Sequence, residues 1–454
     1  MQRLAALLVV LVLLAGCVGT GGPTARPTSP ASPTPGPTLA SPTATPIAIP
    51  TTTPAAGIEL ARSDIARAVV DPVRAAAAAD AINAFSLELY THLASQRGNI
   101  VISPASIAIA LSMARAGAVG TTADQMDKVL HDLGSGALAD AANALDAGLA
   151  ARNGSFPDAG GEAHDVALRI ANAVFTQRGM ALQATYLDTM ASRYGAGLWQ
   201  LDFATDPEAA RQAINRWVSE RTEARIPEIL KQGQVGPAMR LALANAIYLK
   251  APWLNPFDVD QTAPGAFTLA DGTTIQVPLM HLHAMVTYGV GRGWKAVELP
   301  YVGNGLAMTV IVPDDLAAFE AAFDAGSLRS LIGSLRATML DVTMPSFDTA
   351  SRVEVSSVLA ALGMPAAFDP AVADFSGITT AERLHIGFVI HQANITVDEA
   401  GTEAAAATVV GFDTAGPGPD QAELRVDRPF VFILRDVPTG AIVFIGRVAN
   451  PAGS

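Results

Sequence analysis

The chain has one cysteine and few charged residues for its size. Among 454 residues only Cys17 carries a thiol, and Asp, Glu, Lys and Arg together make up 16%. A single cysteine excludes an internal disulfide and a cysteine-based metal cage. The net charge of -13 argues against nucleic acid and against an anionic membrane surface as partners. Half of the residues are hydrophobic, which is enough for a large buried core.

The motifs of common hydrolases are also missing. No serine lies in a GxSxG turn, no HExxH segment occurs, and the seven histidines are scattered. His281 and His283 could offer two metal ligands on one strand face, but no cysteine or carboxylate cluster stands near them. The pair Asp314 and Asp315 does not establish a glycosidase. We therefore expect neither an enzyme nor a bound metal or cofactor.

The first apolar run, Leu4 to Ala15, is too short to span a bilayer. It follows Arg3 and ends in Leu14-Ala15-Gly16-Cys17, so residues 1–16 are predicted to be a signal peptide. The LAGC string resembles the site where bacterial lipoprotein signals are cleaved before a cysteine that carries diacylglycerol. Lipid on Cys17 would attach the secreted protein to the bacterial cell envelope, outside the cytoplasm. An ordinary signal peptide with a chance cysteine is the alternative.

Residues 17–68 are predicted to be a disordered tether behind the lipidated Cys17. Residues 20–56 consist mainly of Thr, Pro, Ser, Ala and Gly, with almost no charge and no apolar period. Such a segment cannot bury enough surface to fold, and its prolines make it extended. The folded part is expected at 69–454 as one domain, because no second linker interrupts it.

Helices are expected early in this domain. Apolar residues recur at helical spacing from Ile82 to Leu93, and Gly98 follows. The string Thr122-Ala123-Asp124-Gln125 resembles a capping box at the start of a helix. Asp206 and Pro207 predict the N-cap and first turn of a helix that runs to about Thr222.

Strands dominate from Leu241 onward. The predicted strands are LALANAIYL, KAVELPY, LAMTVIVP, LDVTMPSF, HIGFVIHQANITV and a terminal hairpin within residues 428–448. Helices that come first and strands that come late indicate an α+β domain.

The segment from Asp398 to Gly411, DEAGTEAAAATVVG, alternates like a strand. With a period of two, one side carries Thr402, Ala404, Ala406, Thr408 and Val410, and none of these is charged. Gly401 permits a backbone swing at its start. The following FDTAGPGPDQAE string is rich in Gly, Pro and Asp and predicts an exposed loop. A mobile loop of small residues therefore precedes the two rigid strands of the terminal hairpin.

This order resembles the C-terminal region of the serpins, and further strings extend the resemblance along nearly the whole folded part. They are NIVISPASIAIALSMARAGAVGTTADQM, LRIANAVF, INRWVSERTEARIPEIL, LANAIYLKAPW, LGMPAAFDPAVADFSGI, DEAGTEAAAAT and DRPFVFILRDVPTGAIVFIGRV. The order and spacing of these strings together are specific. The resemblance implies the serpin fold, with a large central β-sheet, smaller sheets and an exposed reactive-centre loop at about residues 399–423.

The resemblance also assigns site residues. The cluster beneath the centre of the main sheet, where serpin strands separate, is matched by Ser103, Ser106, Asn245 and His391, and the aromatic residue above it by Trp253. The hinge that enters the sheet is matched by Glu399, Gly401, Thr402, Glu403, Ala404, Ala405, Ala406, Ala407 and Thr408. None of these residues is expected to be a catalyst.

The function implied by the resemblance is suicide inhibition of a serine protease, with cysteine proteases as a further target class. The usual spacing from Glu399 puts the scissile bond at Ala415-Gly416, but the segment before Pro429 is longer than usual. Phe412, Thr414 and Gly418 therefore remain alternatives. Small residues suit elastase-like or subtilisin-like proteases, whereas residues 401–423 contain no Arg or Lys for a trypsin-like one.

The expected partner is a target protease held in a covalent complex with a monomer. Residues 131–152 carry few basic residues, so activation by a glycosaminoglycan is not expected. A non-inhibitory serpin-fold protein that is merely cleaved, or that binds a ligand, is the alternative. The hinge separates the two functions, because non-inhibitory members tend to carry charged, bulky or Pro residues there.

Overall fold

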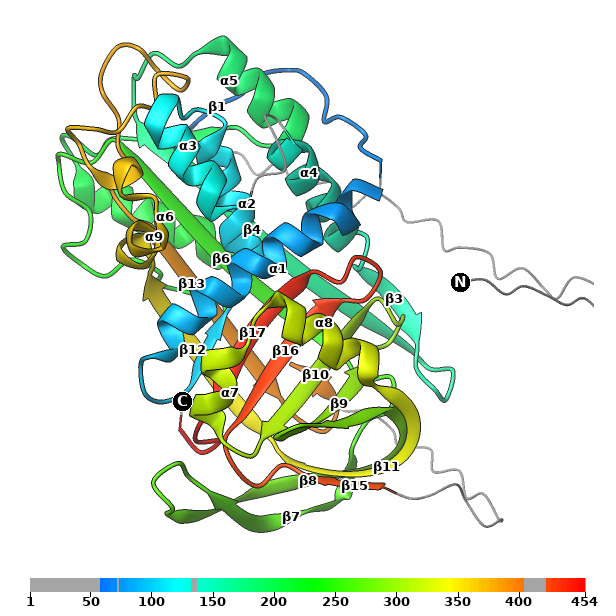
Figure 1. Ribbon diagram of the computed structural model, residues 1–454. Coiled ribbons are helices and arrows are strands. Elements are labelled where there is room, and N and C mark those ends of the chain that lie inside the picture. The colour runs from blue at the N-terminus through cyan, green and yellow to red at the C-terminus, as the bar shows by residue number, and fades with distance from the viewer. Residues whose placement is uncertain (1–57, 72, 132–136, 404–421, 454) are drawn as a thin grey trace, which may run out of the picture. The chain divides into compact units, whose positions relative to one another are not determined.

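The computed structural model describes residues 58–71, 73–131, 137–403 and 422–453. Over these residues it consists of helices packed on two large β-sheets (Figure 1). The helices lie mainly in the first half of the chain and the strands mainly in the second half. The predicted α+β class is therefore confirmed.

Nine α-helices and two short helical turns are present in the described residues. They are α1 (Val73–Ala94), α2 (Pro104–Arg115), α3 (Gly120–Val129), α4 (Ala137–Ala150), α5 (Ala184–Thr189), the π turn η1 (Met190–Tyr194), α6 (Pro207–Arg221), α7 (Leu316–Ala322), α8 (Ala325–Ser334), α9 (Ser356–Leu362) and the 3-10 turn η2 (Pro365–Phe368). At α6 the predicted start is confirmed, because the Asp206 side chain accepts a hydrogen bond from the backbone N–H of Ala209 at 3.0 Å.

The predicted capping box at Thr122 is wrong. Helix α3 begins at Gly120, and its N-cap residue, Val119, has no side-chain cap. Thr122 lies inside the helix and is buried, and its hydroxyl accepts a hydrogen bond from the backbone N–H of Asp374. A tertiary contact therefore uses the oxygen that the local pattern assigned to the helix terminus.

The first sheet, here the main sheet, has eight strands. Their order is β1 (Glu59–Ala61), β5 (Leu198–Leu201), β4 (Ala163–Gln177), β6 (Leu241–Pro252), β14 (Gly401–Thr402), β13 (Val389–Val397) and β12 (Phe347–Glu354), with β3 (Gly154–Pro157) paired to β4. Strands β6 and β13 are parallel and also pair directly with each other. The very short β14 lies between them at one end.

The second sheet holds the remaining strands. Their order is β15 (Ala422–Arg425), β11 (Arg336–Pro345), β8 (Thr274–Gly291), β9 (Trp294–Pro300), β10 (Leu306–Pro313), β16 (Phe430–Asp436), β17 (Ile442–Val448) and β2 (Ile100–Ile102), with β7 (Asp258–Thr268) paired to β8. The predicted terminal hairpin is confirmed, since β16 and β17 are antiparallel neighbours.

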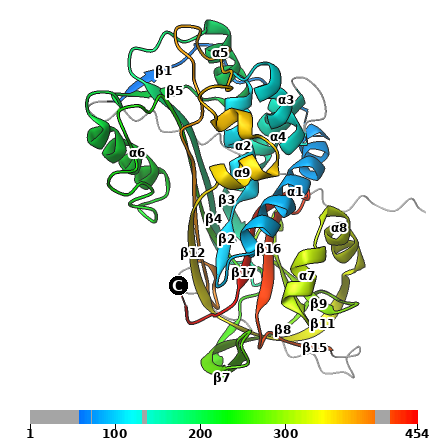
Figure 2. The same ribbon diagram turned by 60° about the vertical axis from the view of Figure 1, so that its left-hand side comes forward.

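The two faces of the main sheet are covered by different helices. In β6, Leu243 and Ile247 belong to the large core shared with α2, whereas Ala244 and Ala246 belong to a second core under α6. This alternation follows from the period of two along a strand. Figure 2 shows α6 on one side of the sheet and α1, α2 and α9 on the other.

The fold begins earlier than the boundary predicted at residue 69. Strand β1 pairs antiparallel with β5, and Ile58 is buried in the core under α6. Farther along, the Arg67 side chain bonds the Asp146 carboxylate at 2.7 Å. The sequence of residues 58–68 did not predict this docking. The contacts are with strand β5 and with Asp146, which lie far along the chain.

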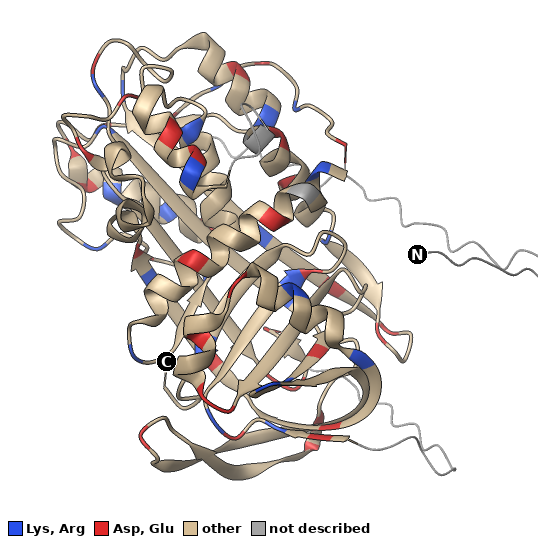
Figure 3. Cartoon of the chain, in the orientation of Figure 1, with Lys and Arg blue, Asp and Glu red and all other residues tan. Residues whose placement is uncertain are grey.

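Acidic and basic residues are interspersed over the helices and loops (Figure 3). Within the described ranges, the structure contains no helix of the length and apolarity required to cross a membrane.

Candidate functional site

The main sheet has a seam where β6 and β13 separate. The two strands pair in parallel from Leu243 opposite Val389 to Ile247 opposite Ala393. Beyond that point the short strand β14 fills the space: Gly401 lies opposite Pro252, and Thr402 lies opposite both Ala251 and Val397. The structure therefore brings the first residues of the predicted hinge between β6 and β13, the two strands that carry Asn245 and His391.

Gly401 is required at the entrance to this seam. Its φ is +155°, and a Cβ atom added there would lie 2.4 Å from the carbonyl oxygen of Ala251 and 2.7 Å from the Cα of Pro252. Both contacts are with backbone, so a side chain could not be accommodated by a rotamer change. Just before it, the Asp398 carboxylate accepts hydrogen bonds from the N–H groups of Ala400 and Gly401. These bonds form the tight turn that returns the chain into the sheet.

An aromatic wall surrounds the inserted residues. Trp253 and Tyr301 are stacked with ring centroids 4.4 Å apart. The Tyr301 and Thr402 hydroxyls are 2.6 Å apart, and Thr402 is completely buried. The Trp253 indole N–H donates to the carbonyl oxygen of Asp398 at 3.0 Å. Trp253, which the sequence placed at the top of the opening, thus contacts the hinge directly.

Glu399 is anchored outside the seam. Its carboxylate accepts a hydrogen bond from the Thr262 hydroxyl at 2.7 Å, and its carbonyl oxygen accepts one from the N–H of Phe257 at 2.8 Å. The hinge is therefore held on both sides of its turn. Residues Ala404 to Thr408 and the alternatives for the reactive bond, Phe412, Thr414, Ala415, Gly416 and Gly418, lie outside the described residues, as does Cys17.

The predicted polar cluster lies below the seam. His391 and Asn245 are register partners on β13 and β6, and the His391 Nδ1 hydrogen-bonds the Asn245 Oδ1. The backbone N–H of Ser103 donates to the His391 Nε2 at 2.9 Å. The Asn245 amide donates to the Ser106 hydroxyl oxygen. The cluster therefore ties together the two strands that flank the insertion path.

His391 is neutral in this arrangement. Its Nε2 accepts a hydrogen bond and so carries no proton, while its Nδ1 donates to the Asn245 oxygen. Complete burial lowers the pKa of His391 to about 3. An uncharged imidazole fits a site whose neighbours are amides and hydroxyls.

Two details of the cluster differ from the prediction. Ser103 joins through its backbone N–H, and its buried hydroxyl has no hydrogen-bond partner among the described residues. Asn172 on β4 belongs to the cluster although sequence analysis missed it. Its Oδ1 accepts hydrogen bonds from Ser106 and Asn245, and it lies directly opposite Asn245 in the sheet. Its place within the LRIANAVF string was the available signal.

Glu403 follows the inserted pair on the α6 side of the sheet. Its carboxylate forms an ion pair with Arg225 at 2.6 Å, and its side chain is only 14% exposed. Burial raises the pKa of the Glu403 carboxyl above its ordinary value, while Arg225 and a hydrogen bond with Tyr248 oppose that rise. Sequence reasoning placed Glu403 in the hinge but did not identify Arg225.

Candidate metal ligands lie elsewhere. His283 pairs with Asp341 at 2.7 Å, but His281 does not join them in a ligand group. In the described part of the chain, the one group of three that could hold a metal ion is Asp158, Glu162 and His164. Asp158 already accepts hydrogen bonds from His164 and from the N–H of Glu162. Nothing connects this hairpin group to a reaction.

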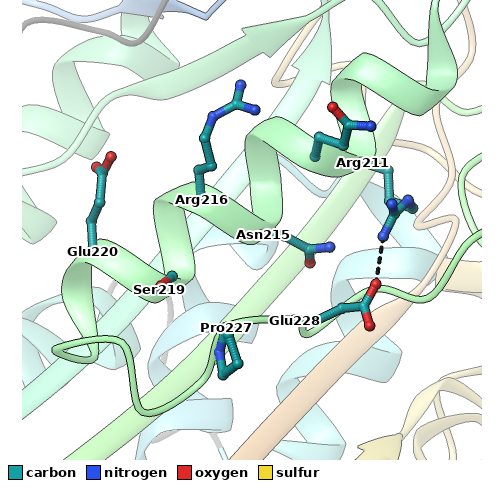
Figure 4. Close-up of a pocket in the computed structure, with 8 residues that line it drawn as sticks. Arg211, Asn215, Arg216, Ser219, Glu220, Pro227 and Glu228 are labelled. Atoms are coloured by element: carbon teal, nitrogen blue, oxygen red, sulfur yellow. Dashed lines mark hydrogen bonds and ion pairs between the residues drawn. The ribbon is translucent and has the colours of Figure 1, made fainter.

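A groove of about 350 Å³ runs between α6 and the connection that follows it (Figure 4). Arg211 borders it and bridges Glu208 and Glu228 at 2.7 and 2.8 Å. Asn215 is occupied by hydrogen bonds with the backbone of Ile229 and Leu230. These contacts of Arg211 and Asn215 hold the connection against α6.

Comparisons with known proteins agree with this geometry. A family model described as Serpin (serine protease inhibitor) matches residues 80–451. An uncharacterized serpin-like protein of Thermococcus kodakarensis is 36% identical over 376 residues, which cover 82% of this chain and 85% of that protein. The leukocyte elastase inhibitor of Bos taurus is 34% identical over 380 residues, which cover 81% and 97%.

Solved structures give the same result. The native-state crystal structure of the thermophilic serpin tengpin matches with a TM-score of 0.75 and 25% identity, covering 86% of this chain and 97% of that one. A maspin structure matches with a TM-score of 0.74 over 84% of this chain and all of that one. Its 22% identity shows the fold alone.

Proposed function

The chain belongs to the serpin family, and we propose that it inhibits serine endopeptidases as a suicide substrate. Members of this family are generally protease inhibitors rather than catalysts. The observation that carries the proposal is the start of a strand between β6 and β13, where Thr402 is buried against Tyr301. A hinge that has entered the sheet by two residues is prepared to enter it further.

The proposed reaction begins as ordinary proteolysis. The protease serine Oγ attacks the carbonyl carbon of the residue before the scissile bond, proposed to be Ala415. The C–N bond to Gly416 breaks, the new amine takes a proton from the catalytic histidine, and an acyl ester remains. Insertion of the cut loop between β6 and β13 then carries the attached protease away before water hydrolyses the ester.

Strand register supports this insertion. Six residues on from the pairing of Thr402 with Ala251 and Val397, an inserted strand would put Thr408 opposite both Asn245 and His391. Their direct hydrogen bond must break to admit the strand. By alternation Thr408 would face the same side as Thr402, so its hydroxyl could hydrogen-bond the two separated side chains. Buried polar groups would then keep partners before and after insertion.

The proposed targets are elastase-like or subtilisin-like proteases, because the residues near Ala415 are small and residues 401–423 contain no Arg or Lys. A chymotrypsin-like target would instead be cut after Phe412. The name of the bovine relative, leukocyte elastase inhibitor, supports the first class. We further propose that lipid on Cys17 holds the inhibitor at the cell envelope and that the tether presents it to proteases there.

Incubation of the purified full chain with elastase and with subtilisin tests the function. We expect a complex that survives boiling in detergent, together with a released C-terminal peptide whose mass identifies the bond. Trypsin, which needs Arg or Lys, is the matched control and should form no such complex. Complete cleavage without a stable complex across these proteases would favour the alternative, a non-inhibitory serpin-fold protein.

A further inference from the structure

The backbone leaves the line of the inserted strand at Glu403. Its N–H still donates to the carbonyl oxygen of Thr396 on β13 at 3.0 Å, as in a continuing strand. Its φ, however, is +52°, in the left-handed region that a residue with a side chain rarely adopts. The residue is therefore positioned in the sheet but bent away from an extended conformation. A contact of Glu403 must therefore stabilise this conformation relative to an extended strand.

The Arg225 guanidinium forms an ion pair with Glu403 in the bent conformation. Arg225 Nε and Glu403 Oε1 are 2.6 Å apart. The two residues before Arg225 are also left-handed, with φ of +51° at Glu223 and +61° at Ala224. Among the described residues, three of the five non-glycine residues with positive φ therefore surround this ion pair. Such strain persists only where surrounding contacts impose it, and it concentrates at functional sites.

Arg225 is itself fixed over the sheet. It lies in the connection between α6 and β6, part of which borders the groove in Figure 4. The Asn394 side chain on β13 donates to the carbonyl oxygen of Arg225 at 3.2 Å. Farther along, Arg352 on β12 donates to the carbonyl oxygen of Ile229 at 2.5 Å. The backbone of the connection is thus fastened to two strands, and the half-exposed Arg225 side chain extends from it to Glu403.

A second cation lies opposite Glu403 in the register of the sheet. Because Gly401 pairs with Pro252 and Thr402 with Ala251, the next pair would be Glu403 with Lys250. Lys250 alternates with the buried Ala251 and so faces the α6 side, as Glu403 does. Opposite charges at directly opposed positions stabilise a strand pair. Burial, together with the negative charges of Glu223 and Asp348, raises the pKa of Glu403, so a cation beside its carboxylate favours the ionised form.

We propose that Arg225 and Lys250 are positioning residues that compete for the Glu403 carboxylate. Arg225 stabilises the bent hinge and stops insertion at Thr402, whereas Lys250 stabilises the extended hinge and favours insertion. This assignment rests on the proposed inhibitory function. The change of Glu403 from the bent to the extended conformation is then the step at which loop insertion is either stopped or continued.

The experiment compares Arg225→Gln, Lys250→Gln and Glu403→Gln in the full chain without protease. Each variant is warmed, and the rate of conversion to a form with a higher unfolding temperature is measured. We expect Arg225→Gln to convert about fivefold faster than the wild type and Lys250→Gln to convert more slowly. In the double variants that combine Glu403→Gln with Arg225→Gln or with Lys250→Gln, the conversion rate should equal that of Glu403→Gln alone. Arg225→Lys, which keeps the charge, should be intermediate and guards against a folding defect.

Hydrogen exchange of the same proteins follows the hinge itself. In Arg225→Gln, the amides of Gly401 to Glu403 should keep their protection, because the hinge stays in the sheet. Loss of that protection would mean that Arg225 holds Gly401 to Glu403 in the sheet and does not limit further insertion. The proposal would then be overturned. Equal conversion rates in Arg225→Gln and the wild type, or acceleration by Lys250→Gln, would also overturn it. Arg292→Gln, at an exposed arginine in the β8–β9 turn, is the charge-matched control.

Protease trapping is measured separately. Arg225→Gln should change the ratio of trapped to merely cleaved inhibitor, whereas Arg292→Gln should not. If the wild type traps no protease, the proposed function fails, yet the conversion rates still decide whether Arg225 and Lys250 compete for Glu403. If the wild type traps protease and the conversion rates do not differ, only the proposal about Arg225 and Lys250 fails.

Discussion

Thr402 occupies a position where the main sheet has no room for a larger or charged side chain. It is completely buried, with its hydroxyl 2.6 Å from that of Tyr301 and with the stacked Trp253 beyond. A threonine suits this place because it is β-branched, small and able to pair with a buried hydroxyl. The first step of insertion therefore depends on one side chain.

The Thr402→Arg variant is expected to lose inhibition while remaining cleavable. Burying an unpaired guanidinium costs several kcal/mol, so insertion should become slower than ester hydrolysis. The fraction of protease trapped, measured on denaturing gels, should fall at least about tenfold, which corresponds to 1.4 kcal/mol. Thr402→Ser keeps the hydroxyl and should trap normally. If the Thr402→Arg variant still traps protease, insertion of the cut loop does not depend on a small, uncharged side chain at this position.

His391 makes the stability of the uncleaved protein depend on pH. Its pKa is about 3 when folded, against 6.5 for an exposed histidine, so between these values the unfolded chain binds more protons. Stability is therefore present above pH 6.5 and is lost as the pH falls toward 3, by up to about 1.4 kcal/mol for each pH unit from this residue.

The measurement is the free energy of unfolding in urea across that range. His391→Gln should show a smaller decrease between pH 6.5 and 4 than the wild type. His92→Gln, at an exposed histidine of α1, should keep the wild-type slope. A wild-type slope that His391→Gln leaves unchanged would show that other groups govern the acid sensitivity.

At the scale of elements, β6 and β13 form a seam whose two ends differ. Near one end they pair directly, and the row of Asn172, Asn245 and His391 crosses three strands there. Near the other end, β14 already separates them. The polar row uses side-chain hydrogen bonds that can be exchanged, so the strands can part without leaving buried groups unpaired.

Thr408→Val tests this exchange. The variant keeps the shape of the side chain but removes the hydroxyl that would face Asn245 and His391 after insertion. We expect the cleaved, inserted form to lose roughly 1–3 kcal/mol, seen as a lower unfolding temperature. The uncleaved form should unfold as the wild type does, and Thr408→Ser should restore the cleaved form. Equal destabilisation of both forms would contradict the register proposed here.

At the scale of the whole molecule, the signal, tether and folded domain are expected to have separate tasks. Cys17→Ser should move the protein from the membrane fraction to the soluble extracytoplasmic fraction of the producing cell, because several acyl chains would be lost. Fractionation followed by immunoblotting measures the shift. The rate of protease inhibition should not change, because the lipid would anchor the folded domain without contributing to its structure. Wild-type protein found only in the soluble fraction would contradict the anchor.

Much of the architecture could be predicted because local patterns agreed with the final contacts. The Asp206 cap, the terminal hairpin and the apolar run of strand β6 all carry short-range signals. The start of α3 could not be predicted, because Thr122 bonds the backbone of Asp374 far along the chain. The docking of residues 58–68 on β5 and α4 was missed for the same reason.

The sequence by itself predicted a hinge of small residues and a loop before the terminal hairpin, because these predictions depend only on residue order and side-chain size. It also supplied the resemblance that assigned Asn245, His391 and Trp253. Only the tertiary structure decided how far the hinge has entered the sheet and which cations compete for Glu403. Arg225 contacts Glu403 from a helix connection, and Lys250 follows in the register of the neighbouring strand β6. Such contacts depend on strand register and on the course of the α6–β6 connection over the sheet, and neither can be predicted from the local sequence.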